Sequence, residues 1–378
     1  FDLVEEAKDV SLDNFPTTAK KLTLFDKLDP ITELKYVDLN IEPGEHTLSL
    51  TSEIKKNLDL SNNQVKYFQD MSDLDDRRFL EQYLPTNLQY DQYAMVADIS
   101  ITGSLVEHSL ITNGSTSKLG INHWETKYPK FYNCSSMYLH IINSQKFKFT
   151  NGTYKSIDGF NRNIFIYTKE GSADLPNILF KTKVILNELE RDYGAWPHNE
   201  VIIYITSPWG GGMEYAGATA TAEHALGHEL HHSYFARSAQ PSNGNASWID
   251  EALASWRDNG YNTSTYVNQD NLGAHSVYQR ITDMGAYSNG ARLIAYLDSK
   301  LKVKGGMKPA LKSFYRDFAY QIYSTSDFIF YLEDYFGEDL SIPFNTTVFG
   351  NDSLSTLFLK DKSTHIRPYT QKEVKALL

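Results

Sequence analysis

The apolar pattern of the chain changes near residue 160, and this change limits the possible folds more than any other feature of the sequence. Upstream, short segments rich in β-branched and aromatic residues alternate with polar residues, as half-buried strands do. These predicted strands cover residues 32–41, 46–51, 94–101 and 137–142. Turn residues punctuate them at 42–44, 112–115 and 151–152, and a helical patch is predicted around 72–83. We therefore predict an N-terminal, sandwich-like β domain over residues 1–165.

Downstream, helical spacing of apolar residues dominates. A strand at 163–168 precedes a helix that Asp174 would cap, with Pro176 in its first turn and Gly194 at its end. The apolar run 201–206 predicts a buried strand. Further helices are predicted over residues 221–235, 248–257, 290–301, 308–323 and 326–336. This order indicates an α+β protein, with a central domain over 166–300 and a mainly helical part over 301–378.

Composition and charge exclude several classes of protein. The 378 residues include 36 basic and 47 acidic side chains, for a formal net charge of −11 without a cluster of Lys or Arg, so nucleic acid is a poor candidate partner. No stretch reaches the roughly 18 apolar residues of a transmembrane segment. The single cysteine, Cys134, cannot form an intrachain disulfide. Because the chain begins at Phe1 and is rich in Asn, Ser, Thr and Tyr, we expect an exported protein, periplasmic or secreted.

The segment His228-Glu229-Leu230-His231-His232 fits the pattern H-E-x-x-H. Helical residues four apart share one face, so His228 and His232 can present two imidazoles to one ion. Zinc prefers such neutral nitrogen ligands in a tetrahedral site. Glu229 lies beside that face, where a base could take a proton from water. The alternative is a surface helix with solvated His and Glu side chains.

Glu251 is the candidate third ligand. It lies among small and apolar residues in the segment 248–254, where a bare carboxylate is costly unless a cation or hydrogen bonds compensate it. It follows His232 by 251 − 232 = 19 positions. Asp250 is a competing candidate, but it projects about 100° away on the same helix.

At this point the sequence resembles the gluzincin zinc metallopeptidases, in which a Glu on a following helix completes an H-E-x-x-H site. The interval between His232 and Glu251 resembles that of the M1 aminopeptidase family and its M61 glycyl aminopeptidase relatives. The segment 211–215, Gly-Gly-Met-Glu-Tyr, resembles the family's G-x-M-E-N motif, and 287–293 resembles its Y-x-x-G-x-x-L element. The motifs follow the family order, and the resemblance runs from about residue 175 to 340.

The resemblance implies a thermolysin-like catalytic domain that hydrolyses peptides or proteins with Zn²⁺ as cofactor. The metal would lie on His228, His232 and Glu251. Glu229 would be the general base, and Tyr287 would stabilise the tetrahedral intermediate. Glu214 would bind the α-ammonium group of an aminopeptidase substrate. The residues implied to contact substrate beside it are Gly211, Gly212 and Met213.

Several other polar residues have less defined roles. His224 and His231 are expected to be solvated or to support the ligands rather than bind metal. Asp258 and Arg257 are candidates for orienting the ligand histidines. Arg280 and Arg292 are candidates for contacts to a substrate carboxylate.

Departures from the family pattern keep three functions open. Tyr215 replaces the Asn of the motif, and the intervals from Glu214 to His228 and from Glu251 to Tyr287 are short for the family. The alternatives are an aminopeptidase, an endopeptidase on the same core, and a catalytically silent binding domain that keeps the fold. Retention of the ligands together with Glu229 argues against the third.

Overall fold

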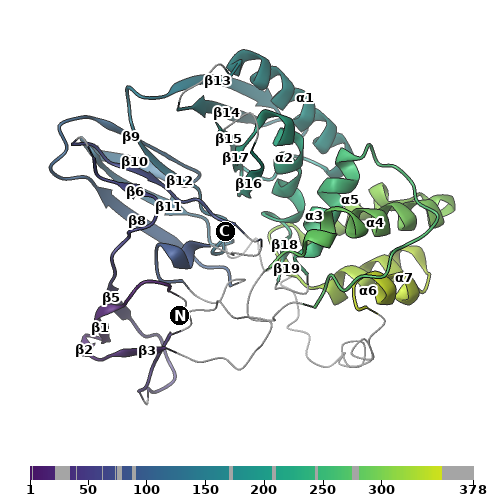
Figure 1. The fold of residues 1–378 in the computed structure, drawn as a ribbon, viewed down its shortest axis with the longest axis horizontal. Coiled ribbons are helices and arrows are strands. Elements are labelled where there is room, and N and C mark those ends of the chain that lie inside the picture. The colour runs from purple at the N-terminus through teal and green to yellow at the C-terminus, as the bar shows by residue number, and fades with distance from the viewer. Residues whose placement is uncertain are drawn as a thin grey trace. The chain divides into compact units, whose positions relative to one another are not determined.

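The computed structural model describes residues 1, 3–21, 35–39, 41–61, 63–72, 74, 79–86, 91–169, 173–206, 210–242, 246–274 and 281–350. The chain divides into two compact units, Phe1–Ser144 and Gln145–Leu378 (Figure 1). The sequence predicts the first domain boundary at residue 165. Residues 148–165 fall instead in the second unit, because they form strands that pair with its central strand. The boundary expected between 300 and 301 falls inside the second unit.

The first unit is built from β-strands. Two of its sheets have the strand orders β10-β11-β8 and β6-β7-β12-β9, and smaller sheets have the orders β2-β1-β5 and β3-β4. The strands are β1 Lys8–Leu12, β2 Phe15–Pro16, β3 Ala19–Lys21, β4 Lys35–Val37, β5 Leu48–Thr51, β6 Leu58–Asp59, β7 Lys66–Phe68, β8 Met95–Ser100, β9 His108–Thr112, β10 Ser115–Gly120, β11 His123–Tyr128 and β12 Leu139–Asn143.

Apolar packing joins the two larger sheets of this unit. Leu139 and Ile141 of β12 form a buried cluster with Tyr67 of β7, and Ile99 of β8 packs against it. This arrangement confirms the predicted β-rich N-terminal part. Within the predicted helical patch at 72–83, Leu80–Gln82 form a short 3-10 helix, and residues 73 and 75–78 lie outside the described residues.

A five-stranded sheet forms one side of the second unit, with strand order β13-β14-β15-β17-β16. Its strands are β13 Lys148–Lys155, β14 Asn161–Thr168, β15 Glu200–Ile205, β16 Gly212–Tyr215 and β17 Ala218–Thr221. Strand β15 is parallel to both β14 and β17, whereas β13 and β16 are antiparallel edge strands.

The turn expected at 151–152 is wrong, because these residues lie inside β13. A Cβ at Gly152 would lie 2.7 Å from a methyl carbon of Leu179, so this glycine lets a helix lie directly on the strand. By contrast, the turn expected at 112–115 connects β9 to β10.

Helix α1, Leu175–Tyr193, covers one face of this sheet (Figure 1). The Asp174 side chain accepts a hydrogen bond from the Asn177 amide, a cap that fixes where the helix begins. Ile178, Leu186 and Leu189 recur at helical spacing and are fully buried against the sheet. The predicted helix from Asp174 to Gly194 is therefore confirmed.

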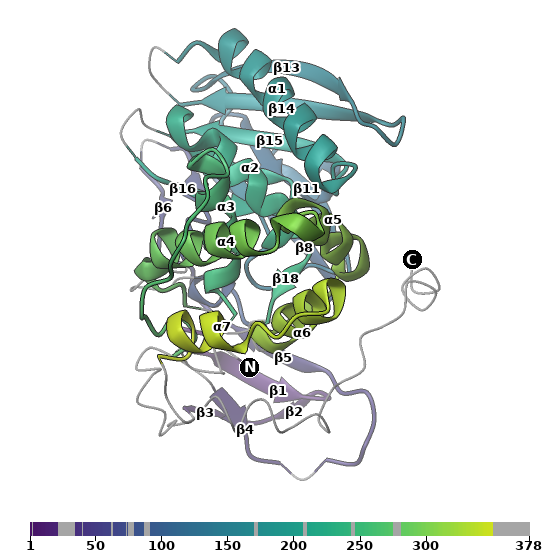
Figure 2. The same cartoon turned by 90° about the vertical axis from the view of Figure 1, so that its right-hand side faces the viewer.

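The remaining helices form a second layer. They are α2 Leu226–Phe235, α3 Trp248–Asp258, α4 Asn289–Lys300, α5 Met307–Phe318, α6 Thr325–Phe336 and α7 Ser341–Thr347. Figure 2 shows α2 and α3 between the sheet and the C-terminal helices. Helix α2 packs on α3, and α3 packs on α4. The helix predicted over 308–323 ends at Phe318, because Ile322–Tyr323 form strand β19 with Gln240–Pro241, strand β18.

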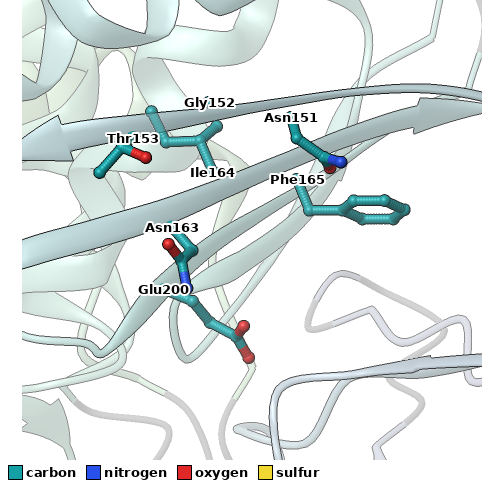
Figure 3. A pocket seen from close by; sticks show the side chains of 7 residues that line it. All are labelled: Asn151, Gly152, Thr153, Asn163, Ile164, Phe165 and Glu200. Atoms are coloured by element: carbon teal, nitrogen blue, oxygen red, sulfur yellow. The ribbon is translucent and has the colours of Figure 1, made fainter.

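A depression opens on strands β13, β14 and β15 (Figure 3). Asn151, Asn163, Phe165 and Glu200 are among its lining residues, and none of the predicted functional residues lines it. Among the described residues, no helix combines the length and apolar character needed to cross a bilayer.

Glu190 joins the C-terminal end of α1 to the sheet. Its fully buried carboxylate accepts hydrogen bonds from Tyr154 Oη at 2.8 Å and from Ser156 Oγ at 2.5 Å. It also accepts the backbone amides of Ile157 at 2.9 Å and Trp196 at 2.8 Å. Removing this carboxylate would leave several buried donors without an acceptor.

We predict that Glu190→Leu lowers the free energy of unfolding by about 3 kcal/mol, because each buried donor left without an acceptor costs about 1–3 kcal/mol. Urea unfolding followed by tryptophan fluorescence measures this change. Asn187→Ala, at an exposed position of the same helix, is the control and should change stability by less than about 0.5 kcal/mol. Equal effects of the two substitutions would show that the Glu190 contacts do not stabilise the fold.

Candidate metal centre

Helix α2 carries the H-E-x-x-H segment on one of two distinct faces. Leu226, Leu230 and Tyr234, spaced four residues apart, are buried in the core. Because two residues correspond to about 200° of helical rotation, His228 and His232 lie on the opposite side. The helix begins at Leu226 rather than at the expected 221, since residues 218–221 form strand β17 and a 3-10 turn follows.

Helix α3 brings Glu251 against both histidines. Its Oε2 lies 2.8 Å from His228 Nε2 and 3.4 Å from His232 Nε2. The two imidazole rings are 4.8 Å apart at their centroids and inclined by 74°. One donor atom from each of the three residues falls within 4.8 Å of the others. Two imidazole nitrogens and one carboxylate oxygen are the protein ligands of many catalytic zinc sites, so this donor set fits zinc.

Asp258 holds the other nitrogen of the first histidine. Its Oδ2 lies 2.7 Å from His228 Nδ1. Asp258 follows Glu251 by seven residues, or about two helical turns, so both carboxylates project from the same face of α3. A ligand histidine usually donates its second N–H to such an acceptor, which fixes the tautomer and the orientation of the ring.

Arg257 connects this arrangement to α1. Its Nε and Nη2 lie 3.0 and 2.8 Å from the two carboxylate oxygens of Glu188, and its Nη1 lies 3.1 Å from Asp258 Oδ1. A Cβ at Gly227 would lie 2.5 Å from Arg257 Nη1. Glycine at 227 is therefore what lets the guanidinium pass beside α2. The suggested orienting roles of Arg257 and Asp258 accord with these contacts.

Asp250, the competing ligand candidate, faces a different atom. Its Oδ2 lies 3.7 Å from His232 Nδ1, on the opposite side of the ring from Glu251. Within the part of the chain that the structure describes, His232 Nδ1 has no hydrogen-bond partner. Asp250 is fully buried and its Oδ1 accepts the Glu251 amide. It therefore supports the start of α3 rather than joining the three donors.

Burial and nearby charges shift the pKa values of the three candidate ligands. Burial opposes the charged form of His228, but hydrogen bonds to Asp258 and Glu251 raise its pKa to about 11. Burial likewise opposes the charge of His232, yet the negative charge of Glu251 leads the effects that raise its pKa to about 9. Burial disfavours ionised Glu251, and the two imidazoles nevertheless hold its pKa well below the usual range. A metal must therefore displace protons from both rings, so affinity should fall at low pH.

Glu229 is buried beside these donors. Burial raises the pKa of its carboxyl to about 8, while the charges of His232 and His228 act in the opposite direction. A Cβ at Gly212 would lie 2.4 Å from the Glu229 carboxyl carbon, so edge strand β16 runs directly against this carboxyl group. Donor atoms of Glu229, Glu214 and His232 also lie within 4.8 Å of one another.

Strand β16 places the side chains of the Gly-Gly-Met-Glu-Tyr segment on two opposite faces. Because side chains alternate along a strand, Gly212 and Glu214 share the face toward Glu229, and Met213 points to the other face. Gly211 precedes the strand, and its carbonyl accepts the Ala222 amide. The predicted contact of the Met213 side chain with substrate is therefore not supported by the direction of the strand, whereas Gly212 and Glu214 lie beside the candidate metal ligands.

Glu214 is paired with a residue that the sequence did not single out. Arg237 Nη2 lies 2.7 Å from Glu214 Oε1, and Arg237 Nε donates to the Glu214 backbone carbonyl at 3.2 Å. Both side chains are almost completely buried. The only signal in the sequence was a basic residue two positions after the metal helix, which by itself indicates no partner.

Tyr287 lies next to the first histidine. It ends a 3-10 turn, Met284–Tyr287, and its ring stacks on His228 with centroids 6.0 Å apart and planes inclined by 13°. A Cβ at Gly290 would lie 2.9 Å from Ala252 Cβ, so the glycine lets α4 approach α3 closely and brings the preceding turn to the site.

Other candidates lie away from the three donors. His224 is exposed, and His231 is fully buried between Tyr193 and Phe235, where burial holds its pKa well below the usual range. Arg292 lies over the ring of Tyr266 at 4.8 Å. Arg280 is outside the described residues.

No family model and no curated protein sequence matches the chain. The fold, however, is that of M1 zinc metallopeptidases.

A mutant of an M1 zinc metallopeptidase from Deinococcus radiodurans, bound to a Tyr-Ser-Ala substrate, has a TM-score of 0.63 and 14% sequence identity over 89% of this chain and 83% of the other. Legionella pneumophila aminopeptidase A, in complex with aspartic acid, has a TM-score of 0.63 and 13% sequence identity, over 92% of this chain and 44% of the other. Leukotriene A4 hydrolase from Saccharomyces cerevisiae has a TM-score of 0.60 and 13% sequence identity, over 99% of this chain and 64% of the other. At these identities the comparison establishes the fold alone, a β-rich N-terminal part followed by a helical C-terminal part.

We predict that Asp258→Ala weakens zinc binding by about 10–100-fold, because loss of an acceptor behind a ligand histidine has this effect in other metal sites. Competition with a chromophoric chelator measures the affinity. Asp334→Ala removes an exposed carboxylate on α6 and is the control, with no expected change. Undiminished zinc affinity in Asp258→Ala would mean that its contact with His228 does not orient a ligand.

Proposed function

We propose that this chain is a zinc-dependent peptidase whose metal binds to His228, His232 and Glu251. The observation that carries the proposal is the convergence of both Nε2 atoms on one carboxylate oxygen of Glu251, at 2.8 and 3.4 Å, with Glu229 buried beside them. The metallopeptidase fold supports the same reading. Two solved structures of that fold contain a Tyr-Ser-Ala substrate and aspartic acid, respectively.

Zinc bound there would supply a Lewis acid that polarises the scissile carbonyl and makes water more acidic. The protein's own contribution begins with Glu229. Its carboxylate lies near the metal ligands without being needed among the three donors, which suits a base that takes a proton from the attacking water and passes it to the leaving amine. Glycine at 212 lets edge strand β16 lie directly against this base.

Tyr287 is proposed to stabilise the tetrahedral intermediate. As water adds to the carbonyl carbon, the carbonyl oxygen becomes negative, and a phenol hydroxyl can donate a hydrogen bond to it. The ring already stacks beside His228, so its backbone turn holds it at the site before substrate binds.

Glu214 is proposed to bind the free amino terminus of the substrate, which would make the enzyme an aminopeptidase of M1 or M61 type. Its carboxylate lies on the same face of β16 as Gly212 and close to Glu229 and His232. An anion at this distance from the catalytic centre favours a substrate whose scissile bond is the first one after a cationic amino terminus. Export to the periplasm or the medium remains a prediction of the sequence.

Two alternatives follow from the same fold. An endopeptidase would use the same metal and base but would gain nothing from a cationic substrate terminus. A silent binding domain would keep the fold without turnover. The intact donor set and the buried Glu229 favour catalysis over the silent domain.

We predict that Glu229→Gln lowers kcat by at least about 100-fold, because general-base catalysis contributes roughly 10²–10⁴ to such rates. Zinc content, measured by atomic absorption, should remain that of the unmodified protein. Asp334→Asn, which changes an exposed acid on α6, is the control and should retain full activity. Activity unchanged by Glu229→Gln would remove Glu229 from the mechanism.

We predict that a peptide library is cleaved at the first peptide bond, and that a chelator abolishes cleavage. N-acetylated copies of the best substrates should be cut at least about tenfold more slowly, since they lose a charge-assisted contact worth about 1.5–3 kcal/mol. Internal cleavage of free and acetylated peptides at equal rates would favour the endopeptidase. Chelator-resistant cleavage would reject the zinc mechanism.

A further inference from the structure

The buried ion pair between Arg237 and Glu214 is unexplained by metal binding or by proton transfer. Arg237 is fully buried and Glu214 is 3% exposed. Burying a guanidinium and a carboxylate together costs solvation, which hydrophobic residues of similar size would avoid. The pair is therefore not expected to add much to the stability of the fold. Its location next to the candidate metal ligands points instead to a role in the site.

Arg237 holds Glu214 at two atoms. Nη2 lies 2.7 Å from the side-chain Oε1, and Nε donates to the backbone carbonyl of the same residue at 3.2 Å. One rigid guanidinium thus fixes both the rotamer of Glu214 and the local backbone of edge strand β16. Lysine offers a single flexible ammonium and cannot reproduce this two-point contact.

Arg237 is also tied to the metal helix. It follows the last residue of α2, Phe235, by two positions, and its amide donates to the His232 carbonyl at 3.0 Å. The arginine therefore links the helix that bears two metal ligands to the strand that bears Glu214. The separation between the metal position and the Glu214 carboxylate is set through this link.

Charge supports the same conclusion. Donor atoms of Glu214 and Glu229 lie within 4.8 Å of each other and of His232, and two carboxylates this close repel. The guanidinium, with Nη2 at 2.7 Å from Glu214 Oε1, offsets that repulsion. A substrate ammonium group bound by Glu214 would add a second positive partner for the same carboxylate.

We propose that Arg237 is a positioning residue that sets the selectivity of the site for a free amino terminus, by fixing the Glu214 carboxylate at a constant distance from the metal. This inference rests on the proposed function, because it takes Glu214 to be the anchor for the substrate amine. The ligand class is a peptide or amino-acid derivative with an unblocked α-ammonium group. Arg237 acts through Glu214 and does not touch substrate.

The test compares two inhibitors that bind zinc identically. Leucine hydroxamate carries an α-amino group, and 4-methylpentanohydroxamic acid is the same molecule without it. Calorimetry on the zinc-loaded protein gives both dissociation constants without requiring turnover, and their ratio reports amine selectivity. We expect Arg237→Met to reduce this ratio by about tenfold or more, as loss of a charge-assisted contact does, with affinity for the deaminated compound unchanged.

Three further variants make the outcome decisive. In a Glu214→Gln background, Arg237→Met should reduce the ratio no further, because residues that act as one unit are not additive. Arg237→Lys keeps the charge and should give an intermediate ratio; it also provides the comparison if Arg237→Met does not fold. Arg316→Met removes an exposed arginine on α5 and should leave the ratio unchanged.

A ratio equal to that of the unmodified protein in folded Arg237→Met or Arg237→Lys would overturn the inference while leaving the aminopeptidase proposal intact. Equal loss of affinity for both hydroxamates would also overturn it, since that result describes general damage to the site. If the unmodified protein binds both compounds equally, the assignment of Glu214 as amine anchor fails, and this inference fails with it.

Discussion

The second unit depends on one electrostatic requirement, that the buried carboxylate of Glu251 has positive partners. Helices α2 and α3 satisfy it by presenting His228 and His232 to the same oxygen. Because a charged group is costly to bury alone, helices α2 and α3 can pack together only if the site supplies positive charge next to Glu251. Either a divalent cation or protons on the two imidazoles can supply the positive charge. The site therefore favours the metal-bound or the protonated state over a state without metal in which both rings are neutral.

Around this centre, two rows of charged residues extend into the scaffold. On one side, His228 leads to Asp258, Arg257 and then Glu188 on α1. On the other, Glu229 neighbours Glu214, which Arg237 neutralises. Each row ends on a different element, α1 or the segment after α2. These contacts hold the metal ligands and the proposed amine anchor in place against the two layers of the fold.

Local spacing predicts that His228 and His232 share one face of a helix, because residues four apart lie close together in angle. Glu251 was predicted from its apolar surroundings and from its interval after His232, which resembles that of a known family. The packing of α3 on α2 is what brings it to the histidines. The pairing of Arg237 with Glu214 joins a loop to an edge strand 23 residues away, and no periodicity encodes it. Polar edge strands such as β13 were missed for a related reason: partners, rather than an apolar pattern, keep them extended. This also explains why the boundary expected at residue 165 differs from the division after Ser144.

Glycine at 212 leaves a space one hydrogen atom wide between β16 and the acid on α2, since a methyl carbon there would lie 2.4 Å from the Glu229 carboxyl carbon. A side chain at position 212 would therefore push the strand and the acid apart, so the spacing between β16 and α2 depends on this residue having no side chain. The burial of Glu229 next to the metal ligands depends on the same spacing.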